Sequence, residues 1–111
     1  MSHPSVTSHR DITPAELHHM LAATSVLLVD VREPDEFAAG HISGAVNLPL
    51  SSFAPSNVPD AGGRTIVLQC AGGKRSGMAL DRCAAAQSAI DTHLVGGIGA
   101  WAAAGYPVVR G

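Results

Sequence analysis

The sequence is organised around the stretch TIVLQCAGGKRS, residues Thr65–Ser76, in which a short apolar run meets a glycine-rich turn and an alanine-rich segment. The run Thr65–Gln69 predicts a buried strand, and the segment from about Arg75 to Ser88 predicts a helix. A strand that leads directly into a helix is the repeating unit of α/β proteins with a parallel sheet. Cys70 then lies beyond the carboxyl end of its strand, where open α/β sheets place their active sites.

The flanking segments continue this alternation of strands and helices. Further strands are predicted at Val26–Val29, Ala45–Leu48 and His93–Val95, and further helices at Pro14–Ala23, Pro34–Ala39 and Gly97–Ala104. Residues 51–63, rich in proline, glycine and polar residues, predict a connecting loop in which one helical turn can form. The sequence therefore predicts an α/β fold around a mostly parallel sheet, without repeats or a second domain.

Length and composition limit the classes of protein that remain. The 111 residues are 46% hydrophobic and 14% charged, which predicts one domain, 1–111, with a folded core at about 12–109 and a polar N-terminal tail at 1–10. The net charge of −2 and the lack of a basic block give no reason to expect a nucleic acid partner. No apolar run approaches the roughly 18 residues of a membrane span, and no signal peptide is visible, so we expect no membrane partner and a cytoplasmic location.

The loop that begins at Cys70 has the composition of an anion site. A cysteine acts as a nucleophile in its thiolate form, which a helix N-terminus and the neighbouring Lys74 and Arg75 would favour. Gly72 and Gly73 allow backbone N–H groups to turn inward on an anion, because no Cβ stands in the way. The sequence predicts a cysteine anion in a small loop that also binds an anionic substrate.

Three other patterns lead to no site. Cys83 is expected about 12 Å along the helix from Arg75, beyond the reach of a disulfide to Cys70. The six histidines contain no pair at zinc-ligand spacing, so neither a metal nor another cofactor is expected. The segment Gly97–Ala102 matches G-x-G-x-x-A, but no acidic residue follows it to hold a ribose, so we do not interpret it as a dinucleotide site.

Three blocks of sequence together resemble the signatures of the single-domain rhodanese family of sulfurtransferases. The first block is Asp30–Glu33 with Glu36-Phe37, Gly40–Ile42 and Gly44–Pro49, the second is Cys70–Ser76 as C-x-x-G-x-R-S, and the third is Gly96–Ile98 with Ala100-Trp101 and Ala104–Val108. The blocks occur in the order and spacing of the family, over about Ile12 to Val109. The resemblance implies a rhodanese-like fold, a five-stranded parallel sheet with helices on both faces.

The resemblance also implies a reaction in two steps. The Cys70 thiolate would take the outer sulfur of thiosulfate or a similar small anionic donor, and the resulting persulfide would pass it to a thiophilic acceptor such as cyanide or a thiol. The implied substrate-binding residues are Ala71, Gly72, Gly73, Lys74, Arg75 and Ser76. Of these, the planar fork of Arg75 is the better candidate for holding two donor oxygens. Asp30 and Arg32 are expected to lie beneath the loop, as a salt bridge that supports it.

Alternative functions remain on the same site. Four residues separate Cys70 from Arg75, whereas rhodanese-fold phosphatases and arsenate reductases have five, so the shorter loop favours sulfur transfer over phosphoryl transfer. A persulfide carrier, which receives sulfur from one protein and delivers it to another, would use the same loop and is not separated from an enzyme by sequence. An inert regulatory domain is disfavoured, because such domains commonly lack the cysteine that is present here.

Overall fold

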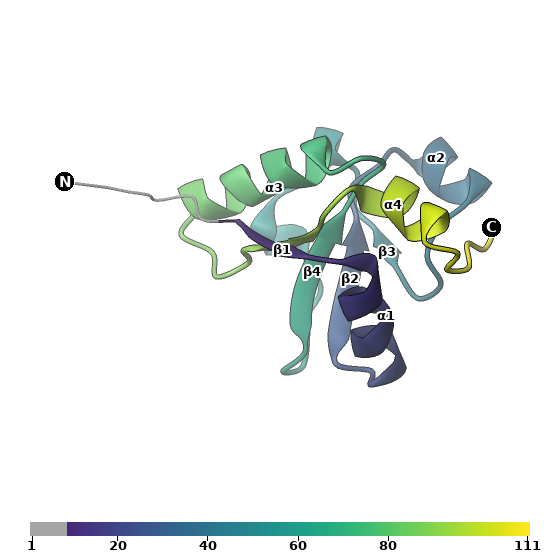
Figure 1. The fold of residues 1–111 in the computed structure, drawn as a ribbon. Helices are drawn as coiled ribbons and strands as arrows, with labels where there is room; N and C mark the ends of the chain where they lie inside the picture. The colour runs from purple at the N-terminus through teal and green to yellow at the C-terminus, as the bar shows by residue number, and fades with distance from the viewer. Residues whose placement is uncertain (1–8) are drawn as a thin grey trace.

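The computed structural model describes residues 9–111. Its strands are β1 (Arg10–Ile12), β2 (Val26–Asp30), β3 (Val46–Asn47), β4 (Thr65–Gln69) and β5 (Thr92–Leu94). Its α-helices are α1 (Pro14–Ala22), α2 (Pro34–Ala39), α3 (Lys74–Ala85) and α4 (Gly97–Ala103), and the 3-10 helices are Leu50–Ser52 and Pro55–Asn57. The elements alternate along the chain as Figure 1 shows, which confirms the predicted α/β class.

The five strands form one parallel sheet in the order β1-β5-β4-β2-β3. The long strands β2 and β4 lie side by side at its centre, with Asp30 paired with Gln69 at their carboxyl ends. All five residues of β2 are buried, as expected for a strand of a parallel sheet covered on both faces. The residues that follow β2 and β4 therefore meet at one edge of the sheet.

One strand, β1, was not predicted from the sequence. β1 begins at Arg10, the last residue of the expected polar tail. Its sequence, Arg-Asp-Ile, is too short and too polar to show a strand periodicity, and its pairing with β5 comes from tertiary contact. Residues 1–8 of that predicted tail lie outside the described residues. The other predicted strands and helices are present, with ends shifted by up to three residues. The connecting loop predicted at 51–63 differs, because two short 3-10 helices, Leu50–Ser52 and Pro55–Asn57, lie in or at the start of it.

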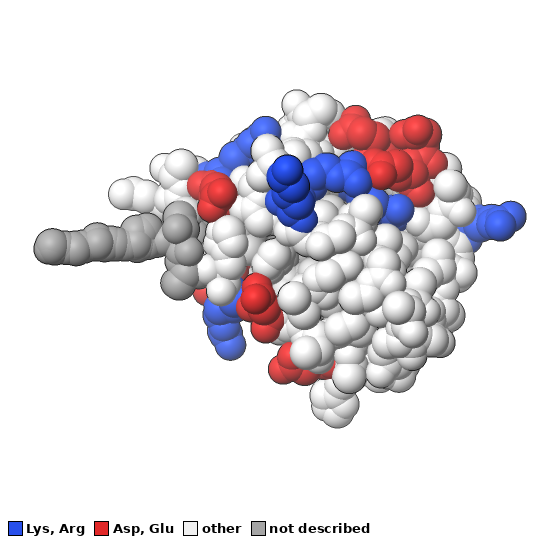
Figure 2. Space-filling model, turned by 45° about the horizontal axis from the view of Figure 1, so that its top comes forward, with Lys and Arg blue, Asp and Glu red and all other residues white. Residues whose placement is uncertain are grey.

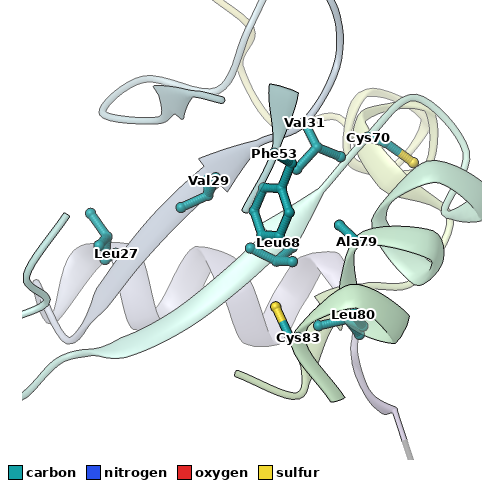
Figure 3. Packing of buried hydrophobic residues seen from close by; sticks show 9 residues of the cluster. All are labelled: Leu27, Val29, Val31, Phe53, Leu68, Cys70, Ala79, Leu80 and Cys83. Atoms are coloured by element: carbon teal, nitrogen blue, oxygen red, sulfur yellow. The ribbon is translucent and has the colours of Figure 1, made fainter. Parts of the chain in front are cut away.

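Helices cover both faces of the sheet and form two apolar clusters. On one face α3 packs against β2 and β4, as Figure 3 shows for the cluster Leu27, Val29, Val31, Phe53, Leu68, Cys70, Ala79, Leu80 and Cys83. On the other face α1 and α4 contribute to the cluster Leu17, Val26, Leu28, Ile42, Val67, Leu94 and Trp101. Cys70 belongs to the first cluster, so the predicted nucleophile lies on the α3 side.

The described residues contain neither a membrane-spanning helix nor a metal-binding cluster. No helix among them is long and apolar enough to cross a membrane. No group of three histidine, cysteine or acidic side chains in residues 9–111 is arranged to hold a metal ion.

Candidate active site

Cys70 lies directly after β4, at the start of the loop that leads into α3. Only 1% of the residue is exposed, so the predicted nucleophile is almost completely buried. Cys70 is buried because it belongs to the same apolar cluster as Val31 and Phe53, on the α3 side of the sheet. Figure 3 shows the Cys70 sulfur directed away from the other side chains of the cluster, on the side where α3 begins.

The loop backbone nevertheless supplies hydrogen bonds to the sulfur. The N–H of Gly73 donates to Cys70 Sγ at 3.0 Å, and Gly73 has a φ of 102°, which favours glycine. Burial alone would raise the pKa of Cys70. Hydrogen bonds from the Ser76 backbone and side chain and from the Gly73 and Gly72 amides outweigh burial and lower that pKa. The inward-facing amides that the glycines predicted are therefore present.

The start of α4 holds this loop from outside. The N–H of Ile98 donates to the carbonyl of Cys70 at 2.8 Å, and the N–H of Gly99 donates to that of Ala71 at 3.0 Å. Gly97 has a φ of 60°, and a Cβ on it would lie 2.2 Å from the Cys70 carbonyl oxygen. The glycines of the G-x-G-x-x-A pattern, Gly97 and Gly99, thus allow the backbone of α4 to lie close to the backbone of the cysteine loop.

Arg75 is committed to an ion pair within the protein. Its two terminal nitrogens donate to the two carboxylate oxygens of Glu36 at 2.7 and 2.9 Å, in the bidentate geometry that guanidinium favours. The same bond lowers the pKa of Glu36 to about 2. The predicted grip of Arg75 on donor oxygens is therefore not available in this structure, because the fork ties α3 to α2.

Lys74 is the exposed cation of the loop. Ala71 and Gly72 are exposed too, so the outer surface of the loop consists of backbone and one ammonium group. Figure 2 shows acidic side chains gathered over α2 beside basic side chains on the same face. Opposite charges thus lie next to each other on this side of the molecule.

Asp30 and Arg32 form a buried ion pair, and its predicted support of the cysteine loop stays a prediction. Arg32 Nη2 donates to Asp30 Oδ2 at 2.8 Å, and the exposed fractions of the residues are 0% for Asp30 and 6% for Arg32. The same nitrogen donates to the carbonyl of Gly40 at 2.7 Å. The pair therefore fixes the end of α2 directly, and the charges of Arg32 and Asp30 also act on Glu36 and Arg75.

Sequence reasoning missed a polar contact on the far side of the cysteine. Ser76 Oγ lies 3.6 Å from Cys70 Sγ and 2.8 Å from Nδ1 of His93, and His93 Nε2 lies 2.8 Å from an oxygen of Asp11. The available signal was a histidine in β5, a strand whose three residues are all buried. Asp11 gave no signal, because its strand was not predicted.

Cys83 is a packing residue. It is fully buried, both cysteines are free thiols, and burial raises the pKa of Cys83 to about 11. At neutral pH it is therefore the unreactive cysteine of the pair.

Comparison with known proteins agrees with this arrangement. The model of the rhodanese-like domain matches residues 13–104. A protein of Allochromatium vinosum described as a sulfurtransferase is 38% identical over 89% of this chain and 94% of its own length. An uncharacterised Synechocystis protein is 43% identical over 96% of this chain and 59% of its own length. The probable adenylyltransferase/sulfurtransferase MoeZ of Mycobacterium tuberculosis is 40% identical over 82% of this chain and 24% of its length, so the chain spans only part of several longer relatives.

Solved structures show the same fold. A rhodanese-related protein of Thermoplasma volcanium superposes with a TM-score of 0.79 at 30% identity, covering 93% of this chain and 100% of that one. A thiosulfate sulfurtransferase of Pseudomonas aeruginosa gives a TM-score of 0.81 at 22% identity over 93% of this chain and 20% of its own, which is a likeness of fold. The cysteine loop, the sheet order and the sequence matches lead to one assignment: this chain belongs to the rhodanese-like domain family.

Proposed function

We propose that the protein is a sulfurtransferase that carries sulfane sulfur as a persulfide on Cys70. The observation that carries the proposal is the hydrogen bond of 3.0 Å from the Gly73 N–H to the almost completely buried Cys70 sulfur. Such hydrogen bonds from the loop lower the pKa of Cys70. A thiolate at this position is the nucleophile that a persulfide requires. The membership of the family, with a sulfurtransferase among its relatives, supports the same chemistry.

The proposed reaction consists of two displacements at sulfur. The Cys70 thiolate attacks the outer sulfur of thiosulfate or a related donor, a new S–S bond forms, and sulfite leaves with the electrons of the broken bond. The acceptor, a thiol or cyanide, then attacks the terminal sulfur and restores the Cys70 thiolate. The thiolate and the persulfide anion both carry a negative charge on sulfur, so the amides of Gly72, Gly73 and Ser76 stabilise both.

The remaining loop residues have proposed roles that follow from their exposure. Lys74 is exposed, and its ammonium group would attract an anionic donor without holding it in a fixed geometry. Ala71 and Gly72 would present their backbone to that donor. Arg75 would act on the donor only through its charge, because Glu36 occupies its fork.

Mass spectrometry of the intact protein after treatment with thiosulfate tests this proposal. The protein should gain the mass of one sulfur atom and lose it again when cyanide is added. The matched variants are Cys70→Ser, which should gain nothing, and Cys83→Ala, which should behave like the parent. Sulfur that is still gained by Cys70→Ser would contradict the proposed nucleophile.

A persulfide carrier that serves protein partners is the second candidate. The similarity to a segment of the longer protein MoeZ favours it, because a rhodanese-like segment joined to another catalytic unit would have a neighbour to serve. Rapid loading by a cysteine desulfurase together with slow steady-state turnover on thiosulfate would support the carrier. Fast turnover on thiosulfate would support the enzyme. The cytoplasmic location stays a prediction.

A further inference from the structure

A chain of hydrogen bonds leads from the buried sulfur to solvent at the edge of the sheet. It runs from Cys70 Sγ to Ser76 Oγ at 3.6 Å, from there to His93 Nδ1 at 2.8 Å, and from His93 Nε2 to Asp11 Oδ1 at 2.8 Å. Ser76 is fully buried and His93 is 8% exposed, whereas 59% of the Asp11 side chain is exposed. A proton that leaves Cys70 therefore has an internal acceptor within two hydrogen bonds.

The partners of His93 determine where its proton lies. An ionised carboxylate only accepts hydrogen bonds, so Nε2, which faces Asp11, must carry the hydrogen. Nδ1 of neutral His93 is then bare and accepts the hydroxyl hydrogen of Ser76. The carbonyl of Gly73 is a second acceptor for that hydrogen at 3.2 Å, but Nδ1 of His93 is nearer at 2.8 Å. With the hydroxyl hydrogen on the His93 side, the contact with Cys70 uses the thiol hydrogen, and the sulfur donates to Ser76 Oγ.

We propose that His93 is the positioning residue that receives the Cys70 proton through Ser76, with Asp11 holding the imidazole in the required tautomer. This inference rests on the proposed function, in which Cys70 must become a thiolate. In the step, the thiol hydrogen moves to Ser76 Oγ while the Ser76 hydrogen moves to His93 Nδ1. The products are a thiolate and an imidazolium, and no other reactant is needed.

The hydrogen bonds reverse their direction after this transfer. Protonated Nδ1 donates to Ser76 Oγ, so the Ser76 hydroxyl is free to point its hydrogen at the sulfur. The thiolate then accepts from the Ser76 side chain as well as from the Gly73 amide, and both contacts are among the causes that lower the pKa of Cys70. The serine in the loop thus serves the thiol as an acceptor and the thiolate as a donor.

Other charged groups face this chain from several elements. The ring of His9 meets that of His93 edge to face at a centroid distance of 5.7 Å, and His9 Nε2 lies 2.9 Å from Asp81 on α3. On the sulfur side, the charge of Arg75 interacts with Cys70. The side chains of Asp11 and Asp81 are 59% and 58% exposed, so solvent screens their charge, and the main role of Asp11 is orientation.

The rate of alkylation of Cys70 by iodoacetamide as a function of pH tests the proposal without any sulfur donor. The measurement uses the Cys83→Ala background, so that one thiol reports. His93→Asn is the informative variant, because its amide can still hydrogen-bond Ser76 but cannot take a proton. We expect its midpoint to move to higher pH, with a rate at pH 7 about tenfold lower, equivalent to one pKa unit, and a rate equal to the parent's at high pH.

Two further variants complete the test. Asp11→Asn should move the midpoint in the same direction by less, because the amide permits the wrong tautomer. His19→Asn makes the same change as the His93 variant on an exposed residue of α1 and should leave the profile unchanged. An unchanged midpoint in His93→Asn, or an equal loss of rate at every pH, would overturn the proposal.

The outcomes remain separable from other failures. If His93→Asn does not fold, the exposed Asp11→Asn decides alone, and an unchanged midpoint there would overturn the relay. If the protein forms no persulfide but the profiles shift as expected, the sulfurtransferase proposal fails while the relay stands.

Discussion

Replacing Glu36 by glutamine should loosen the contact between α2 and the start of α3. The substitution keeps the size of the side chain and removes the charge that Arg75 binds through two hydrogen bonds of 2.7 and 2.9 Å. Because Arg75 lies in the first turn of α3, directly after the cysteine loop, the loop loses one of its external supports. We expect lower stability together with a lower yield of persulfide at limiting thiosulfate.

The size of the effect follows from the titration of Glu36. Its bonds to Arg75, and secondarily to the Glu33 amide, lower its pKa from 4.5 to about 2, which is equivalent to about 3 kcal/mol. The side chains of Glu36 and Arg75 are 35% and 32% exposed, so solvent screening reduces the expected contribution to about 1 kcal/mol. Because the pKa is lowered on folding, the contribution is complete above pH 4.5 and is lost as the pH falls toward 2.

Urea unfolding of the parent and the variant between pH 2 and 7 measures this effect. Asp35→Asn is the matched control, because Asp35 is an exposed acid in the same first turn of α2. Glu36→Gln should cost about 1 kcal/mol more than the control at pH 7, and the difference should vanish near pH 2. Equal losses for the two variants, or a difference that is the same at every pH, would refute the role assigned to the ion pair.

Two other substitutions test the supports of the loop. Gly97→Ala should destabilise the protein by several kcal/mol and reduce persulfide formation, because its Cβ would lie 2.2 Å from the Cys70 carbonyl oxygen. The control Gly105→Ala has a φ of 89° but open space around its Cβ, so it should cost only about 1–2 kcal/mol in urea unfolding. Arg32→Gln leaves the buried Asp30 without its partner and should lower the free energy of unfolding by about 3–5 kcal/mol. The same change at the exposed Arg64 should lower it by under about 1 kcal/mol, as measured by thermal unfolding. Equal losses for Gly97→Ala and Gly105→Ala, or for Arg32→Gln and Arg64→Gln, would contradict the argument.

The sequence predicted the parts of the fold that local pattern determines. The apolar runs of β2 and β4, the helix starts at Pro14 and Pro34 and the glycine-rich loop after β4 are each encoded by neighbouring residues. β1 was missed because three polar-flanked residues become a strand only by pairing with β5. Long-range pairing of this kind leaves no periodicity in the chain.

The site was predicted unevenly for the same reason. Cys70 and its amides follow from residues within one loop, but the partner of Arg75 lies on α2 and the partners of Ser76 lie on β5 and β1. The guanidinium of Arg75, close to Cys70, was predicted to bind an anionic donor. In the structure the anion that it binds is the carboxylate of Glu36. Burial of the sulfur also depends on tertiary contact, since Val31 and Phe53 come from other parts of the chain.

The glycine-rich loop after Cys70 and the glycine-rich start of α4 act as one structural unit. A short loop has amides and carbonyls that point in opposite directions, so amides aimed at a sulfur leave carbonyls aimed outward that need donors of their own. The N–H groups of Ile98 and Gly99 supply two of these donors, and they can do so because Gly97 lets α4 approach the loop backbone. The inward amides that lower the pKa of Cys70 therefore depend on the start of α4, nearly thirty residues further along the chain. A residue larger than glycine at position 97 would disturb the start of α4 and the cysteine loop together.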